Sequence, residues 1–156
     1  MQAYARCIAR YGAVVICMAA AACGGDGGTA PDPPLDIAGA WQISVTVHNN
    51  ALAMSCQAAG PASFTQSGAT FTGEVKGSSG SCDLPTDTTA TSVDGDITDG
   101  QIVGRTVTYT NSGCHYSGTV SGTPANAISG DVNCTVNQGG QAYPFNGTWN
   151  AARSGN

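Results

Sequence analysis

One five-residue pattern recurs along this chain: an apolar residue, any residue, glycine, any residue, and a second apolar residue. Side chains of a strand alternate between its two faces, so the apolar residues and the glycine share one face. Glycine repeated on an inner face marks tight bends and close approach of backbones, as at the corners of a barrel. The pattern therefore predicts a strongly curved sheet. Its occurrences are Ile37-Gly39-Trp41, Phe71-Gly73-Val75, Val93-Gly95-Ile97, Tyr116-Gly118-Val120, Ile128-Gly130-Val132 and Phe145-Gly147-Trp149.

The composition also favours strands. Glutamate and lysine, both good helix formers, occur once each, whereas threonine, valine and aromatic residues recur in short runs. Neighbouring runs are joined by short turn-rich links, which predicts an all-β, eight-stranded antiparallel up-and-down barrel. An eight-stranded β-sandwich is the alternative. The expected strands lie near 37–47, 61–66, 69–76, 91–97, 101–110, 113–121, 126–136 and 142–152.

The first 36 residues have the features of an export signal and a tether. A positively charged start precedes an apolar run from Gly12 to Ala22, which is too short to span a bilayer as a mature helix. Ala20-Ala21-Ala22-Cys23 resembles the lipobox of bacterial lipoproteins, although the family prefers leucine where Ala20 stands. The resemblance implies cleavage before Cys23 and its acylation; an ordinary signal peptide cut after a small-residue triplet is the alternative.

These features divide the chain into four parts. Residues 1–22 are the expected signal peptide, 23–36 the lipidated cysteine with a Gly- and Pro-rich tether, 37–153 the barrel domain, and 154–156 a tail. The lipoprotein resemblance implies a protein exported and anchored to the bacterial envelope. In a bacterium with two membranes it implies the outer membrane, because no aspartate directly follows Cys23.

Four cysteines remain in the expected domain: Cys56, Cys82, Cys114 and Cys134. An even number in an exported domain indicates two disulfides, for which three pairings exist. A hairpin centred on Pro124 places Cys114 opposite Cys134, within reach of a bridge. The expected pairs are therefore Cys114–Cys134 and Cys56–Cys82. A zinc site is the alternative, although the C-x-x-C spacing of such sites is missing.

Charge and motifs argue against several functions. After Cys23 there are three cations against ten carboxylates, so nucleic-acid binding is not expected. Asp94, Asp96 and Asp99 depart by one residue from the spacing of a calcium loop, and a strand followed by an Asp-Gly turn explains them better. We find no nucleophile elbow and no paired acid–base motif, so we expect neither an enzyme, a metal site nor a cofactor.

Both ends of the expected domain resemble the calycins, which include lipocalins and avidins. Gly39-Ala40-Trp41 is similar to the G-x-W signature of the first calycin strand. Trp149-Asn150-Ala151-Ala152-Arg153 is similar to the ending of avidins. The resemblance implies that Arg153, from the last strand, lies across Trp41 and closes one end of the barrel, which a cation–π contact would stabilise. Biotin binding is not implied, because the other binding tryptophans of avidins have no counterparts.

Three kinds of function remain. The leading interpretation is a membrane-anchored lipoprotein whose barrel binds a small apolar ligand through inward aromatic residues. The second is a packed structural or interaction module of the cell envelope, and the third, a hydrolase or isomerase, has least support. A continuous apolar cavity would favour the first and a filled interior the second. Besides Trp41 and Trp149, the candidate ligand-binding residues are Phe64, Phe71, Tyr109, Tyr116 and Phe145, and Leu52 and Met54 are expected near the barrel mouth.

If Cys23 carries the anchor, Cys23→Ala releases the exported protein into the soluble fraction, because no acyl chain remains to hold it. Fractionation of cells expressing the two forms measures this. A Cys23→Ala protein that is exported and still sediments with membranes contradicts lipid anchoring.

Overall fold

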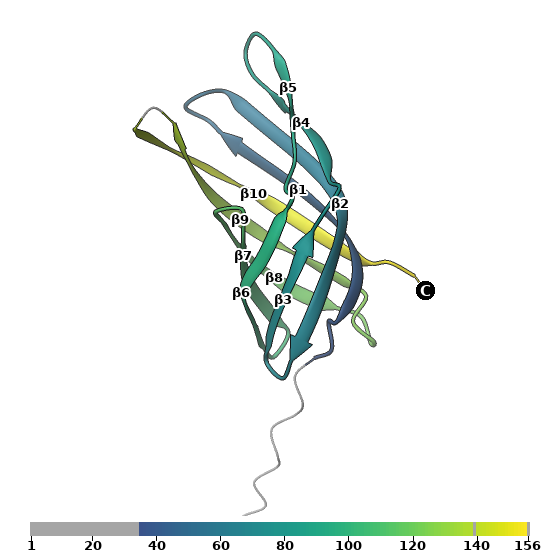
Figure 1. Ribbon diagram of the computed structural model, residues 1–156. Coiled ribbons are helices and arrows are strands. Elements are labelled where there is room, and N and C mark those ends of the chain that lie inside the picture. The colour runs from purple at the N-terminus through teal and green to yellow at the C-terminus, as the bar shows by residue number, and fades with distance from the viewer. Residues whose placement is uncertain (1–34, 139, 156) are drawn as a thin grey trace, which may run out of the picture. The chain divides into compact units, whose positions relative to one another are not determined.

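The computed structural model describes residues 35–138 and 140–155, which form one antiparallel sheet of ten strands (Figure 1). The expected signal peptide, Cys23 and most of the tether lie outside the described residues. Within the two described ranges, no helix capable of crossing a bilayer occurs. The strands are β1 (Gly39–Asn49), β2 (Met54–Ser67), β3 (Thr70–Val75), β4 (Ser79–Asp83), β5 (Thr88–Thr91), β6 (Gly95–Val103), β7 (Thr106–Asn111), β8 (Cys114–Ser121), β9 (Ala127–Gln138) and β10 (Gln141–Arg153).

Eight of the strands close into a barrel, and β4 and β5 form a hairpin outside the ring. The order around the ring is β1-β10-β9-β8-β7-β6-β3-β2, and β2 returns to β1. Trp41 of β1 faces Arg153 of β10 on one side and Ala62 of β2 on the other. The predicted all-β, eight-stranded antiparallel barrel is thus confirmed, and the sandwich alternative is wrong.

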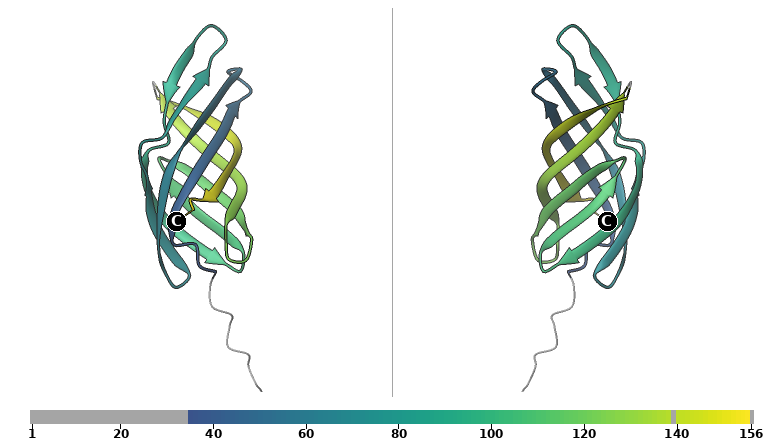
Figure 2. Two further views of the ribbon diagram at one scale, coloured as in Figure 1. Left: turned by 90° about the vertical axis from the view of Figure 1, so that its right-hand side faces the viewer. Right: turned by 90° about the vertical axis from the view of Figure 1, so that its left-hand side faces the viewer.

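The two ends of the barrel differ. At the closed end the chain enters through Ile37 and turns between β2 and β3 at Ser67–Thr70. At the open end the β1–β2, β4–β5 and β9–β10 hairpins extend beyond the other strands (Figures 1 and 2). There β4 pairs with the first residues of β2, while β3 pairs with the last ones. The upper wall therefore consists mainly of these three hairpins.

Both predicted disulfides are present. In the β8–β9 hairpin, Tyr116 faces Val132 and Cys114 faces Cys134, as the pattern around Pro124 predicts. The Cys114–Cys134 bridge joins these strands, and Cys56–Cys82 joins β2 to β4. A bridge that closes a loop of about 20 residues stabilises a small domain by roughly 3 kcal/mol.

The strand pattern corrects two expectations. Asp99–Gly100 does not turn between strands but lies at a bulge within β6, and the turn comes after Val103. Gly100 is needed there because a Cβ would contact the ring of Phe71 at 2.7 Å. The chain between the expected strands near 37–47 and 61–66 is also largely strand, since β2 begins at Met54, and the β4–β5 hairpin was not expected at all.

Inward glycines make room for the core, as the repeat predicts. The indole of Trp149 packs over Gly118, where a Cβ would lie 2.8 Å from its Cζ2 atom. The same indole donates a hydrogen bond to the carbonyl of Ser117 at 3.1 Å. Larger residues at position 118 would push Trp149 out of its place, so this glycine and tryptophan act as one unit.

Arg153 and Gln66 hold the entering chain across the closed end. The guanidinium lies over the Trp41 ring at 4.8 Å and donates to the carbonyls of Ala38 and Ala125 at 2.6 and 2.8 Å. Gln66 accepts a hydrogen bond from the Ile37 amide at 2.8 Å. The indole of Trp41 donates to the Ile37 carbonyl at 2.9 Å. The predicted contact between Trp41 and Arg153 is therefore present.

Replacing Arg153 with alanine should lower the free energy of unfolding by about 1–2 kcal/mol, through the lost cation–π contact and unpaired carbonyls. Arg153→Lys should recover only part of this, because an ammonium lacks the planar fork of donors. Urea unfolding of the three proteins measures the differences. A change below about 0.5 kcal/mol for Arg153→Ala would mean that Arg153 acts as an ordinary surface residue.

Candidate functional site

The lower half of the barrel is filled by aromatic side chains. Tyr109 and Tyr116 stack with their ring centres 4.5 Å apart, and Trp149 meets both rings edge-on. Phe64 packs against Phe71 at 5.3 Å. Such edge-on and offset contacts add to the burial energy of each ring. This part of the interior is a packed core with no room for a ligand.

Above this aromatic layer the interior opens into a cavity of about 540 Å³ that reaches the solvent at the open end. Its volume is within the range of ordinary small-molecule sites. The β1–β2, β4–β5 and β9–β10 hairpins supply most of the wall, and the β7–β8 turn supplies its lower edge. The lining residues are Val45, Val47, Leu52, Met54, Cys56, Gln57, Ala58, Cys82, Leu84, Pro85, Thr91, Ser92, Val93, Ser112, Cys114, Tyr116, Cys134, Val136, Tyr143 and Phe145.

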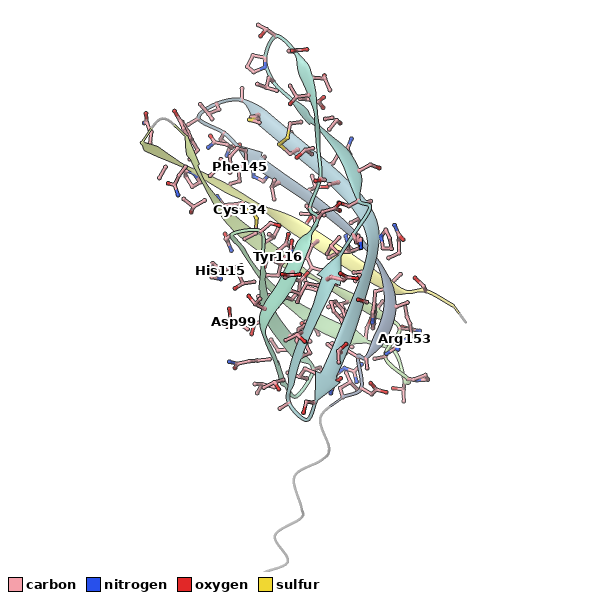
Figure 3. The ribbon with its side chains drawn as sticks, viewed as in Figure 1. Asp99, His115, Tyr116, Cys134, Phe145 and Arg153 are labelled. Carbon is pink, nitrogen blue, oxygen red and sulfur yellow. A yellow bond between two sulfur atoms is a disulfide. The ribbon has the colours of Figure 1, made fainter. Side chains whose placement is uncertain are left out.

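The lining is mainly apolar and carries no charged side chain among the described residues. Most of it consists of aliphatic side chains, both disulfides, and the aromatic residues Tyr116, Tyr143 and Phe145. Figure 3 places Tyr116, Cys134 and Phe145 along the interior between the closed and open ends. When an apolar molecule covers an apolar surface that was in contact with water, the free energy falls by roughly 25 cal/mol per Å² of surface buried.

The five predicted ligand-binding residues separate into two groups. Tyr116 and Phe145 belong to the cavity wall, as do Leu52 and Met54 at its rim. Phe64, Phe71 and Tyr109 lie below it in the aromatic core and are at most 3% exposed. Gly39, Trp41 and Arg153 are at the closed end, away from the cavity lining.

Much of the cavity wall was missed in the sequence. Val45 and Val47 continue the inward alternation of β1, so period two could have identified them. Leu84 and Pro85 follow β4, and Val136 lies near the end of β9, where no repeat of the glycine pattern exists. Only the arrangement of the hairpins in space brings these residues to one cavity.

Two phenols are buried at the boundary between core and cavity. Burial raises the pKa of Tyr116 to about 12, and burial followed by the proximity of Tyr116 raises the pKa of Tyr109 well above its usual value. The Tyr109 hydroxyl has no hydrogen-bond partner among the described residues, nor has the side-chain oxygen of buried Asn111. Unpaired buried polar atoms cost free energy, so these two groups lower the stability of the folded barrel.

Of the three aspartates considered for calcium, Asp96 and Asp99 lie within β6, and Asp94 precedes it and holds the turn after β3. The carboxylate of Asp94 accepts hydrogen bonds from the amides of Gly77 and Ser78 at 3.1 and 2.7 Å, and from the Ser78 hydroxyl. These bonds lower the pKa of Asp94, the Ser78 hydroxyl most. Between residues 35 and 155, residue 139 aside, no three His, Cys, Asp or Glu side chains gather as metal ligands would. Asp94 therefore holds the β5–β6 connection against the β3–β4 connection.

Comparison with known proteins identifies no family. No model of a known protein family matches the chain, and no curated protein matches it. A crystal structure from Nitrosomonas europaea, described as AttH, aligns with 72% of this chain at 8% identity and a TM-score of 0.31. This chain spans about half (49%) of the length of that protein.

The buried phenols predict a stability that falls at alkaline pH. Their folded-state pKa values lie above the ordinary value of 10.0, so the unfolded chain loses these protons first. The contribution is fully present below pH 10 and is lost as the pH rises through about 12. Urea unfolding across this range should show the loss, and Tyr116→Phe should reduce it. In a folded Tyr143→Phe protein, where Tyr109 and Tyr116 are the phenols left in the described residues, phenolate absorbance that develops at the ordinary pKa would contradict the burial of both rings.

Proposed function

We propose that this protein is an exported, lipid-anchored binding protein with a calycin-like barrel, and that it holds one small, uncharged apolar molecule in its upper cavity. The observation that carries the proposal is the cavity of about 540 Å³ with an apolar, uncharged lining. A continuous cavity is what distinguishes a binding barrel from a packed structural module. The filled lower half fits either function, and the cavity in the upper half supports the binding barrel.

The calycin-like assignment has support from the closed end. The contact of Arg153 with Trp41 joins the first and last strands of the ring, in the manner that the resemblance implies. Shared fold alone does not assign a function, because small barrels host many. The proposed role therefore depends on the cavity.

Lipid anchoring and export have support from the sequence and the cysteines. Ala20-Ala21-Ala22-Cys23 resembles a lipobox, and the tether that follows has little to bury. Two disulfides fit an oxidising compartment such as the cell envelope. The described chain enters the barrel at the closed end through Ile37, at the end away from the cavity.

Binding is favoured over catalysis by the chemistry of the wall. General acid–base catalysis needs a titratable group positioned near the reacting atom. Among the described residues that line the cavity, the ionisable groups are the phenols of Tyr116 and Tyr143, with no carboxylate or imidazole. We therefore propose a carrier or sensor of an apolar molecule, in place of an enzyme.

An uncharged fluorescent probe tests the proposal. N-phenyl-1-naphthylamine should bind the wild-type protein with enhanced fluorescence. Val47→Phe should weaken binding by about tenfold, or about 1.4 kcal/mol, because the added ring occupies the cavity.

Gln42→Phe is the matched control, since it adds a ring on the exposed face of the same strand. It should bind the probe as the wild type does. Equal affinities for wild type and a folded Val47→Phe protein would mean that the probe binds elsewhere, and absence of binding to wild type would remove the support for a ligand cavity.

A further inference from the structure

The sheet around the cavity is incomplete on one side, and we call this gap between β5 and the end of β9 the side opening. In the sheet, β5 pairs with β4 alone and has a free edge. On the other side, β8 begins at Cys114, so the residues of β9 beyond Cys134 pair with β10 alone. No described strand joins β5 to this last part of β9, and the β7–β8 turn lies below the space between them (Figure 1).

Polar and apolar groups are segregated within the cavity. The wall formed by β1, β2 and β10 is mainly aliphatic and aromatic, with Val45, Val47 and Phe145 as examples and Gln57 of β2 as a polar exception. Hydroxyl groups line the side opening, where Thr91 ends β5, Ser92 follows it and Ser112 lies in the β7–β8 turn. Ser112 is placed there by a hydrogen bond from its hydroxyl to the Asp94 carbonyl at 2.9 Å.

We propose that the ligand is a single-chain amphiphile whose alkyl chain fills the cavity and whose uncharged polar head lies at the side opening, against Thr91, Ser92 and Ser112. This inference rests on the proposed function and specifies its ligand. A slender apolar chain buries surface against the aliphatic wall. A polar head at the opening keeps its hydrogen bonds with water and with the hydroxyls, and so avoids the cost of burial.

The charges near the opening favour a head without charge. Among the described residues that line the cavity, no lysine or arginine is present to pair with an anionic head. The carboxylates nearest to Ser92 along the chain are those of Asp94 and Asp96, which would repel an anion. A cationic head would in turn find no carboxylate among the described lining residues.

Displacement of N-phenyl-1-naphthylamine by two twelve-carbon ligands locates the head. At low ionic strength and below the micellar range, monolauroylglycerol should bind wild-type protein more tightly than laurate. Ser92→Lys places a cation at the opening and should raise the affinity for laurate relative to that for monolauroylglycerol by about two- to fivefold. Leu52→Lys places the same cation at the hairpin rim and should change this ratio less than Ser92→Lys does.

The outcomes separate the two proposals. Laurate that responds to Leu52→Lys and not to Ser92→Lys would place the head at the rim and overturn the side opening. A response to neither lysine, or a probe that neither ligand displaces, would overturn the amphiphile while leaving the apolar cavity in use. If the probe itself does not bind wild-type protein, the proposed function fails first.

Discussion

Closure of the ring is the constraint on which the rest of this structure depends. Because β1 pairs with both β10 and β2, eight strands must enclose an interior of limited width. Bulky rings fit only where the facing residue has no side chain, as Gly118 has none beneath the ring of Trp149. Arg153 and Gln66 hold the entering chain across one end of the barrel, and the other end stays open.

The two halves of the barrel differ because their strands differ in length. Near the closed end all eight strands of the ring contribute, and aromatic side chains fill the space they enclose. Toward the open end β7 and β8 stop at the turn around Ser112, and the β4–β5 hairpin lies outside the ring, where β5 pairs with β4 alone. The aromatic layer therefore ends where the wall becomes incomplete, and a cavity results. Disulfides on two sides of this cavity, Cys56–Cys82 and Cys114–Cys134, hold the hairpins that form it.

The sequence predicted features that depend on local alternation. The register of β8 with β9 follows from opposing Gly118 to Gly130 about the turn, and it brought Cys114 to Cys134. The pairing of β1 with β10 was predicted from the contact between Trp41 and Arg153 that the calycin resemblance implies. Asp99–Gly100 misled, because an Asp-Gly pair suits a turn equally well as a bulge, and only contact with Phe71 distinguishes them. The cavity could not be predicted, since empty space depends on where strands stop, and β4 and β5 are short runs of Ser, Gly and Thr without apolar alternation.

Native mass spectrometry of the protein purified from its own host tests the central claim, that the upper half of the barrel holds one apolar molecule. We predict that part of the protein is heavier than the acylated polypeptide by the mass of a single small molecule. Extraction with organic solvent should remove that mass while both disulfides and the lipid anchor remain. A spectrum that shows only the acylated polypeptide, with the barrel folded and no added mass under the gentlest conditions, would contradict the claim.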